Sequence, residues 1–199
     1  MHNGRLTFAA VKTNDMNTNT HIQQWQKQTA HLLSQTQKLV DLPDEVLKWR
    51  AANDSWSVLE CIEHLNLYGK HYLPIIKKHI AESNTQPEAT LKSGWLGRYF
   101  AQSMLPGNNM KSMRTFKSKN PLNIPLNKTT LHHFMDQQKE MLDLLEASKQ
   151  VSLNKVKIPT SISMLIRLKL GDTFQFLINH QLRHFDQLEK ALVKQQVRL

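Results

Sequence analysis

The stretch that decides the fold is DTFQFLINHQLRHFDQLEKALVK, residues 172–194. Its apolar residues recur at steps of three and four, which is typical of an α-helix with one buried stripe. The stripe contains Phe176, Leu177, His180, His184, Leu188, Ala191 and Leu192. We therefore predict a long helix whose buried face carries two imidazoles, with Asp172 as its N-cap.

Three further segments have the same period. They predict helices from Thr20 to about Val40, from Ser57 to about Glu82, and from roughly Thr129 to Lys149. The second of these opens with Ser57-Val58-Leu59-Glu60, the form of a capping box, in which the Ser hydroxyl and the Glu carboxylate each bind a backbone amide.

The rest of the chain connects these helices. Four of the seven prolines fall between Ser83 and Asn127, which predicts a long crossover with a short helix around Leu91 to Met104. Residues 1–17 are a polar tail without apolar period, and residues 18–199 are predicted to form a single domain. No stretch shows sustained strand alternation. Four amphipathic helices with one crossover between the second and third predict an all-α protein, a four-helix bundle.

Composition excludes several classes of protein. The 199 residues are 40% hydrophobic and 21% charged, as in folded globular chains, and one cysteine cannot form an internal disulfide. No apolar run approaches the ~20 residues that span a bilayer, so we expect a cytoplasmic protein without a membrane partner. The net charge of +10 raises the question of nucleic acid. The basic segment 89–135 lacks interleaved aromatic platforms apart from Tyr99, Phe100 and Phe116, and we interpret it as a solvated loop.

Histidines are the candidate functional residues, because metal sites in helical bundles are built from inward side chains. His180 and His184 are one turn apart, so both rings can reach one ion. His64 is the best candidate for a third ligand, and a buried histidine bound to a backbone carbonyl is the alternative. We expect His71 at the rim, His132 or His133 in solvent, and His2, His21, His31 and His79 at the surface.

Neighbouring residues have two interpretations each. Glu60 is either the capping-box partner of Ser57, which we favour, or an acceptor that orients His64. Arg183 either holds an anionic substrate or pairs with Asp186. Gln187 either orients a ligand or lies in a polar pocket. Cys61 is expected in the core rather than in a metal site.

Two segments resemble the DinB/YfiT-like superfamily: Trp56 to Leu65, read as WSVLECIEHL, and His180 to Leu188, read as HQLRHFDQL. Further likeness lies in Tyr72-Leu73-Pro74 and in Gly94-Trp95-Leu96-Gly97. The resemblance covers roughly residues 20–195. It implies an up-down-down-up four-helix bundle in which three histidines bind a divalent metal, commonly zinc, nickel or iron. Carried over by position, the ligands are His64, His180 and His184.

The resemblance also bears on activity. Some members are transferases or isomerases that use a low-molecular-weight thiol, and members are often dimers. The cluster of Trp95, Leu96, Tyr99 and Phe100 is where we expect a partner surface or a lid over the pocket. Three histidines leave a coordination position open for water or a small-molecule substrate, so an ion there could activate water for hydrolysis or a thiol for transfer. The rival hypothesis is a non-catalytic metal-binding, stress-associated protein whose ion contributes only stability.

Overall fold

Four long helices dominate the computed structural model, which describes residues 17–105 and 115–197. The predicted tail therefore lies outside the described residues except for Asn17, whose side chain caps the first helix. The long helices are α1 (Thr18–Val40), α3 (Val58–Ala81), α5 (Thr129–Ala147) and α6 (Leu170–Lys194). The prediction of a helical protein is confirmed, and the ends of these helices agree with the predicted ends to within about two residues.

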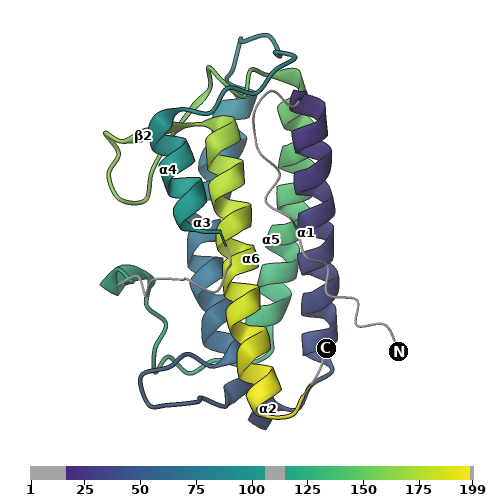
Figure 1. The fold of residues 1–199 in the computed structure, drawn as a ribbon, viewed down its shortest axis with the longest axis vertical. Helices are drawn as coiled ribbons and strands as arrows, with labels where there is room; N and C mark the ends of the chain where they lie inside the picture. The colour runs from purple at the N-terminus through teal and green to yellow at the C-terminus, as the bar shows by residue number, and fades with distance from the viewer. Residues whose placement is uncertain (1–16, 106–114, 198–199) are drawn as a thin grey trace.

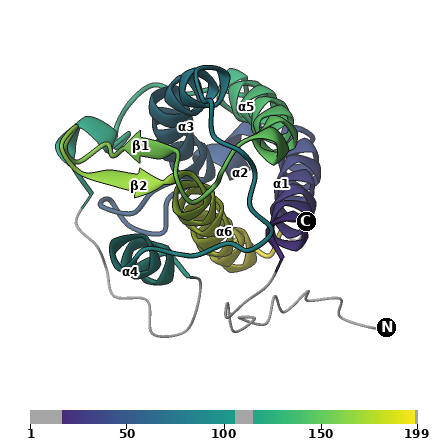
Figure 2. The same ribbon diagram turned by 90° about the horizontal axis from the view of Figure 1, so that it is seen from above.

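The long helices lie side by side, each in contact with two neighbours. α5 packs between α1 and α3, and α6 closes the ring by contacting both α3 and α1 (Figure 2). In Figure 1, α1 and α6 run from top to bottom, whereas α3 and α5 run from bottom to top. α3 and α6, which carry the candidate histidines, are thus antiparallel neighbours.

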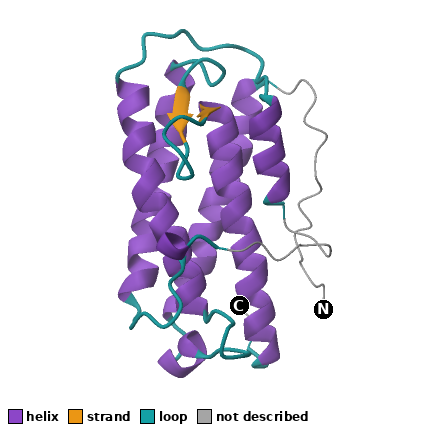
Figure 3. Cartoon of the chain, turned by 90° about the vertical axis from the view of Figure 1, so that its left-hand side faces the viewer, coloured by secondary structure: helices purple, strands orange, loops and turns teal. Residues whose placement is uncertain are grey.

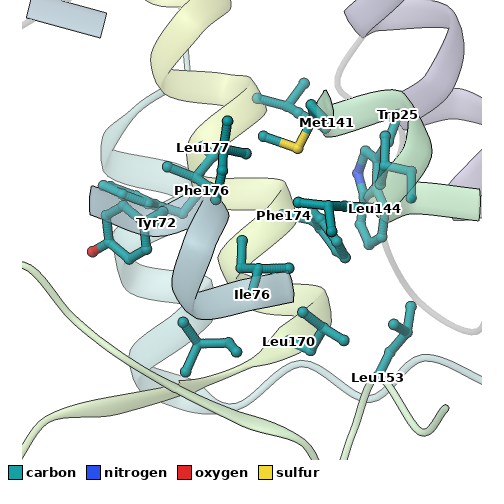
Figure 4. Close-up of a cluster of buried hydrophobic side chains, with 14 of the residues drawn as sticks. Trp25, Tyr72, Ile76, Met141, Leu144, Leu153, Leu170, Phe174, Phe176 and Leu177 are labelled. Carbon is teal, nitrogen blue, oxygen red and sulfur yellow. The ribbon is translucent and has the colours of Figure 1, made fainter. Parts of the chain in front are cut away.

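The interior is filled by two apolar clusters along the helices. One surrounds Trp25 and Phe174, whose ring centroids are 5.9 Å apart. Figure 4 shows that Phe174 and Phe176, two residues apart on α6, point to opposite sides of that helix: Phe174 toward Trp25 and Phe176 toward Tyr72. The other cluster lies nearer the end of α6 and includes Phe134, Phe185 and the buried Cys61. The predicted core position of Cys61 is confirmed, and burial raises its pKa to about 12.

The start of α3 is fixed by buried polar contacts. The Ser57 hydroxyl accepts from the Glu60 amide and the Glu60 carboxylate accepts from the Ser57 amide, so the capping box is confirmed. Arg50, which the sequence analysis did not single out, forms an ion pair with the same carboxylate, and the Asn123 amide donates to it at 2.9 Å. Burial alone would raise the pKa of Glu60, but these hydrogen bonds outweigh it and lower the pKa.

Short elements form the connections. α2 (Asp44–Lys48) follows α1, and the crossover contains α4 (Trp95–Ser103) and the 3-10 turn η1 (Lys117–Lys119). A second 3-10 turn, η2 (Ser148–Gln150), extends α5. The short helix predicted in the crossover is therefore present.

α4 is held against α6 by Asp172, for which the sequence analysis predicted a different role. Asp172 is not the N-cap of α6, because the helix begins two residues earlier, and Lys169 occupies the N-cap position without a side-chain hydrogen bond. The buried Asp172 carboxylate instead accepts from the Gly94 amide at 3.0 Å. A Cβ on Gly97 would lie 2.2 Å from the same carboxylate, so this close approach requires glycine.

A β-hairpin, like α2 and the two 3-10 turns, was not predicted from the sequence. β1 (Lys157–Pro159) and β2 (Arg167–Lys169) pair antiparallel, with Ile158 opposite Leu168. Three-residue strands are too short for a period-two pattern to be recognised. The hairpin lies near one end of the helices (Figure 3), on the same side of the molecule as α4 and beside α3 and α6 (Figure 2).

None of the described helices combines the length and apolar character that crossing a membrane requires.

We expect Glu60→Ala to lower the free energy of unfolding by about 2–3 kcal/mol, because it removes the cap and leaves Arg50 without its carboxylate. Ser57→Ala should cost only about 1 kcal/mol, the usual cost of a lost N-cap. Urea denaturation measures both. The exposed Glu45→Ala serves as the control and should stay within about 0.5 kcal/mol of wild type. Equal losses for Glu60→Ala and Glu45→Ala would contradict the assigned role of the buried carboxylate.

Candidate metal centre

Packing of α3 against α6 brings three histidines together from two distant parts of the chain. His64 lies in the second turn of α3, and His180 and His184 lie one turn apart on the facing side of α6. All three side chains are buried, with exposed fractions of 3%, 4% and 8%. The ligand atoms that they offer all lie within 4.8 Å of one another.

The three Nε2 atoms point toward a common centre. His180 Nε2 lies 3.2 Å from His64 Nε2 and 3.0 Å from His184 Nε2. Among the described residues, these three histidines are the one group of at least three His, Cys, Asp or Glu side chains that lie close enough together to hold a metal ion. Cys61, three residues before His64, is not part of it.

Hydrogen bonds on the opposite edge of two rings favour one tautomer. His64 Nδ1 lies 2.7 Å from the backbone carbonyl oxygen of Lys119, and His184 Nδ1 lies 3.1 Å from Gln187 Oε1. Since both partners are acceptors, each Nδ1 carries the hydrogen and donates it. Each Nε2 then has a lone pair directed at the centre, which is the form that binds a metal. His180 Nδ1 has no hydrogen-bond partner among the described residues.

Burial keeps these imidazoles neutral. Loss of solvent lowers the pKa of His64 to about 4 and that of His184 to about 3, and it lowers the pKa of His180 well below its ordinary value. The nearby positive charge of Arg183 lowers the pKa of His180 and His184 further. Near neutral pH the three imidazoles are therefore uncharged, and the Nε2 atom of His180 lies within hydrogen-bond distance of the Nε2 atoms of His64 and His184.

Aromatic side chains surround the cluster. Trp56 lies against His64 and His184, with ring centroids 4.7 and 5.7 Å away. The ring centroid of Tyr68 lies 4.5 Å from that of His180, and the Phe176 ring stacks on His180 with an interplanar angle of 8°. These rings fix the orientation of the imidazoles and exclude water from much of the cluster.

A cavity of about 310 Å³ opens on the histidines. α3 and α6 form its floor, and α4, the hairpin loop and residues 115–116 of the crossover contribute to its sides. Phe100 of α4 and Met104, the residue that follows this helix, line the cavity, whereas Trp95 and Tyr99 of α4 are exposed, at 82% and 65%. The aromatic cluster predicted as a partner surface or lid is thus divided between the cavity and the solvent.

Other residues singled out in the sequence have these positions. Glu60 is not the hydrogen-bond partner of His64 Nδ1, which is the backbone carbonyl oxygen of Lys119. The favoured capping role of Glu60 is therefore the one observed. Gln187 contacts His184 and lines the cavity. Asp186 pairs with Lys190, and Arg183 lies in the cavity wall with Nη1 3.5 Å from the Ser103 carbonyl oxygen.

The remaining histidines do not join the cluster. His132 and His133 are exposed, as expected, whereas His71 is half-buried but is not among the residues that line the cavity, so its predicted rim position is not borne out. The surface position predicted for His21 is wrong: it is 3% exposed, and its ring centroid lies 5.6 Å from that of the buried Trp25 on the same side of α1. His2 lies outside the described residues.

Two residues at the centre were not singled out by the sequence analysis. Tyr68 is one turn after His64 on α3, so helical spacing from a candidate ligand is the signal that could have found it. Lys119 contributes a backbone carbonyl, which no side-chain pattern can predict. Its ammonium donates to the Leu67 carbonyl oxygen at 2.7 Å and lies over the Tyr68 ring, which anchors η1 to α3.

We expect the metal-free protein to lose stability as pH falls from about 6.5 to 4. The folded-state pKa of each buried histidine lies below the unfolded value, so only the unfolded chain takes up protons in this range. Each such histidine should contribute a slope of about 1 kcal/mol per pH unit. Urea denaturation in the presence of a chelator measures this slope. His64→Gln should reduce it, whereas the exposed His132→Gln should leave it unchanged, and equal slopes in the two variants would refute the assignment.

Comparison with protein-family models finds that residues 27–188 match the DinB superfamily. Neither the curated proteins nor the solved structures contain a match to this chain.

Proposed function

The chain belongs to the DinB superfamily, and from that premise we propose that His64, His180 and His184 bind one divalent metal ion as the centre of a metal-dependent enzyme. The observation that carries the proposal is the convergence of three buried Nε2 atoms, with His180 Nε2 3.2 and 3.0 Å from the other two. The up-down-down-up bundle of the superfamily is the arrangement that we assign to α1, α3, α5 and α6.

The donor set fits a metal of the zinc, nickel or iron type. Neutral imidazoles suit these ions better than magnesium or calcium, which prefer oxygen. Two of the rings already donate their Nδ1 hydrogens to the Lys119 carbonyl and to Gln187. Outer contacts of this kind orient metal-binding imidazoles and increase their basicity. The site therefore requires no rotation of His64 or His184 to present its lone pairs.

An open position supports catalysis rather than a purely structural role. Structural zinc sites are closed by four protein ligands, whereas three histidines leave room for water or substrate. When bound, such an ion acts as a Lewis acid and lowers the pKa of water or of a thiol that binds beside it. The cavity provides access from solvent to this position.

The residues around the centre define what the protein contributes. Trp56 and Phe176 exclude water from the rings. Burial and the neighbouring Tyr72 raise the pKa of Tyr68 to about 12, so its hydroxyl stays protonated and can donate a hydrogen bond within the cavity. We propose hydrolysis, or group transfer to a low-molecular-weight thiol, as the reaction class. In either reaction the nucleophile is water or the small thiol rather than a side chain. The thiol of Cys61 is buried and does not line the cavity.

We expect the wild-type protein to bind one Zn²⁺ or Ni²⁺ per chain, and His184→Ala to weaken binding by about 100-fold or more. Calorimetry on chelator-treated protein, followed by elemental analysis, measures both. His132→Ala, an exposed histidine on α5, is the matched control and should bind as wild type does. Circular dichroism should show that His184→Ala stays folded. A variant that unfolds together with metal loss would favour the non-catalytic alternative, in which the ion contributes stability alone.

Gln187→Leu tests the outer contact separately. It keeps all three imidazoles but removes the acceptor of His184 Nδ1, so metal affinity should fall by about 10-fold. Calorimetry measures the change against Gln23→Leu, which makes the same substitution on the exposed face of α1. Unchanged affinity in Gln187→Leu would show that the amide does not orient the ring.

A further inference from the structure

The wall of the cavity above the histidines is unusually aromatic for a solvent-accessible space. Tyr68, Tyr72, Phe176 and Phe100 form a continuous chain of rings, with successive centroids 6.4, 6.2 and 6.2 Å apart. All four line the cavity. Phe176 also stacks on His180, so this aromatic wall leads directly to the histidine cluster.

The apolar character continues to the entrance. Phe116 and Ile162 line the cavity and are still 54% and 49% exposed, and they come from the crossover and the hairpin loop respectively. Apolar surface that faces water is unfavourable. An apolar ligand body that covered the wall and these two side chains would recover that free energy.

Charge in the cavity is unevenly placed. Among the described lining residues, Asp54 is the one carboxylate, and it is exposed at the rim. Arg183 supplies the guanidinium and is next to His184 on α6, at the same end of the cavity as the cluster. Its charge is close enough to lower the pKa of His180 and His184. The inner end therefore favours an anion, and a bound divalent ion would add to that preference.

We propose that this cavity binds a small amphiphile, with an apolar body against Tyr72, Phe100 and Phe176 and a single anionic head group between Arg183 and the histidine cluster. The inference deepens the proposed function by naming its substrate class. It rests on that function for the bound metal ion, whereas the aromatic wall and the Arg183 guanidinium are features of the structure itself. A hydrophilic ligand would leave the aromatic wall wet, and a cationic one would face Arg183.

The probe is 4-phenylbutanoate, titrated calorimetrically into metal-free and zinc-loaded protein. We expect it to bind both forms, the zinc-loaded form more tightly, and to bind at least about tenfold more tightly than butanoate, which lacks the ring. It should also bind at least about tenfold more tightly than 4-phenylbutan-1-ol, which lacks the charge.

Two variants with matched controls locate the probe. Phe100→Ala should weaken 4-phenylbutanoate binding about tenfold, whereas the neighbouring exposed Tyr99→Ala should not. Arg183→Gln should weaken binding of the carboxylate about tenfold but leave the alcohol unchanged, and the exposed Arg98→Gln should affect neither.

The outcomes separate this proposal from the proposed function. If no metal binds but 4-phenylbutanoate binds the metal-free protein with these sensitivities, the substrate class holds and the metal centre fails. If metal binds but neither form binds 4-phenylbutanoate, the substrate class fails alone. Equal affinities for 4-phenylbutanoate and butanoate, or binding unaffected by both Phe100→Ala and Arg183→Gln, would also overturn it.

Discussion

Burial of three imidazoles at one point between α3 and α6 is the constraint on which the rest of this structure depends. Neutral histidines in an apolar interior need hydrogen-bond partners. His64 and His184 obtain them on their outer edges, from the Lys119 carbonyl and from Gln187, which leaves their Nε2 lone pairs facing inward. Burial lowers the pKa of each ring, so the cluster stays uncharged near neutral pH and its Nε2 atoms remain able to bind a cation. Such an arrangement is understandable as a binding site for a cation.

The connections around the helices form the cavity through which a ligand can reach this cluster. η1 carries the carbonyl that orients His64, and the ammonium of the same Lys119 ties it to α3. α4 is fixed to α6 through Asp172 and the close approach at Gly97, which places Phe100 and Met104 in the cavity wall. The hairpin adds Ile162 at the entrance. The helices therefore supply the ligand atoms, while the crossover and the hairpin determine what can reach them.

Helical periodicity predicted the helices and the pairing of His180 with His184 and made His64 the best candidate for a third ligand, whereas the set of three was implied by the resemblance to the DinB/YfiT-like superfamily. His180 and His184 share the apolar stripe of α6, and His64 interrupts the apolar stripe of α3, so their meeting requires only that the two stripes pack together. Features that depend on tertiary contacts were not accessible in this way. Asp172 has the form of an N-cap but lies in the first turn and binds Gly94, and His21 was assigned to the surface although it is buried beside Trp25. The backbone carbonyl of Lys119 and the strands of the hairpin carry no periodic signal.

The most direct test of the central claim is X-ray absorption spectroscopy on protein loaded with one equivalent of zinc. Binding by His64, His180 and His184 predicts a first shell of nitrogen or oxygen at about 2.0–2.1 Å, with outer-shell scattering from three imidazole rings. Scattering from fewer than three imidazoles, or a sulfur ligand at about 2.3 Å from Cys61, would contradict it.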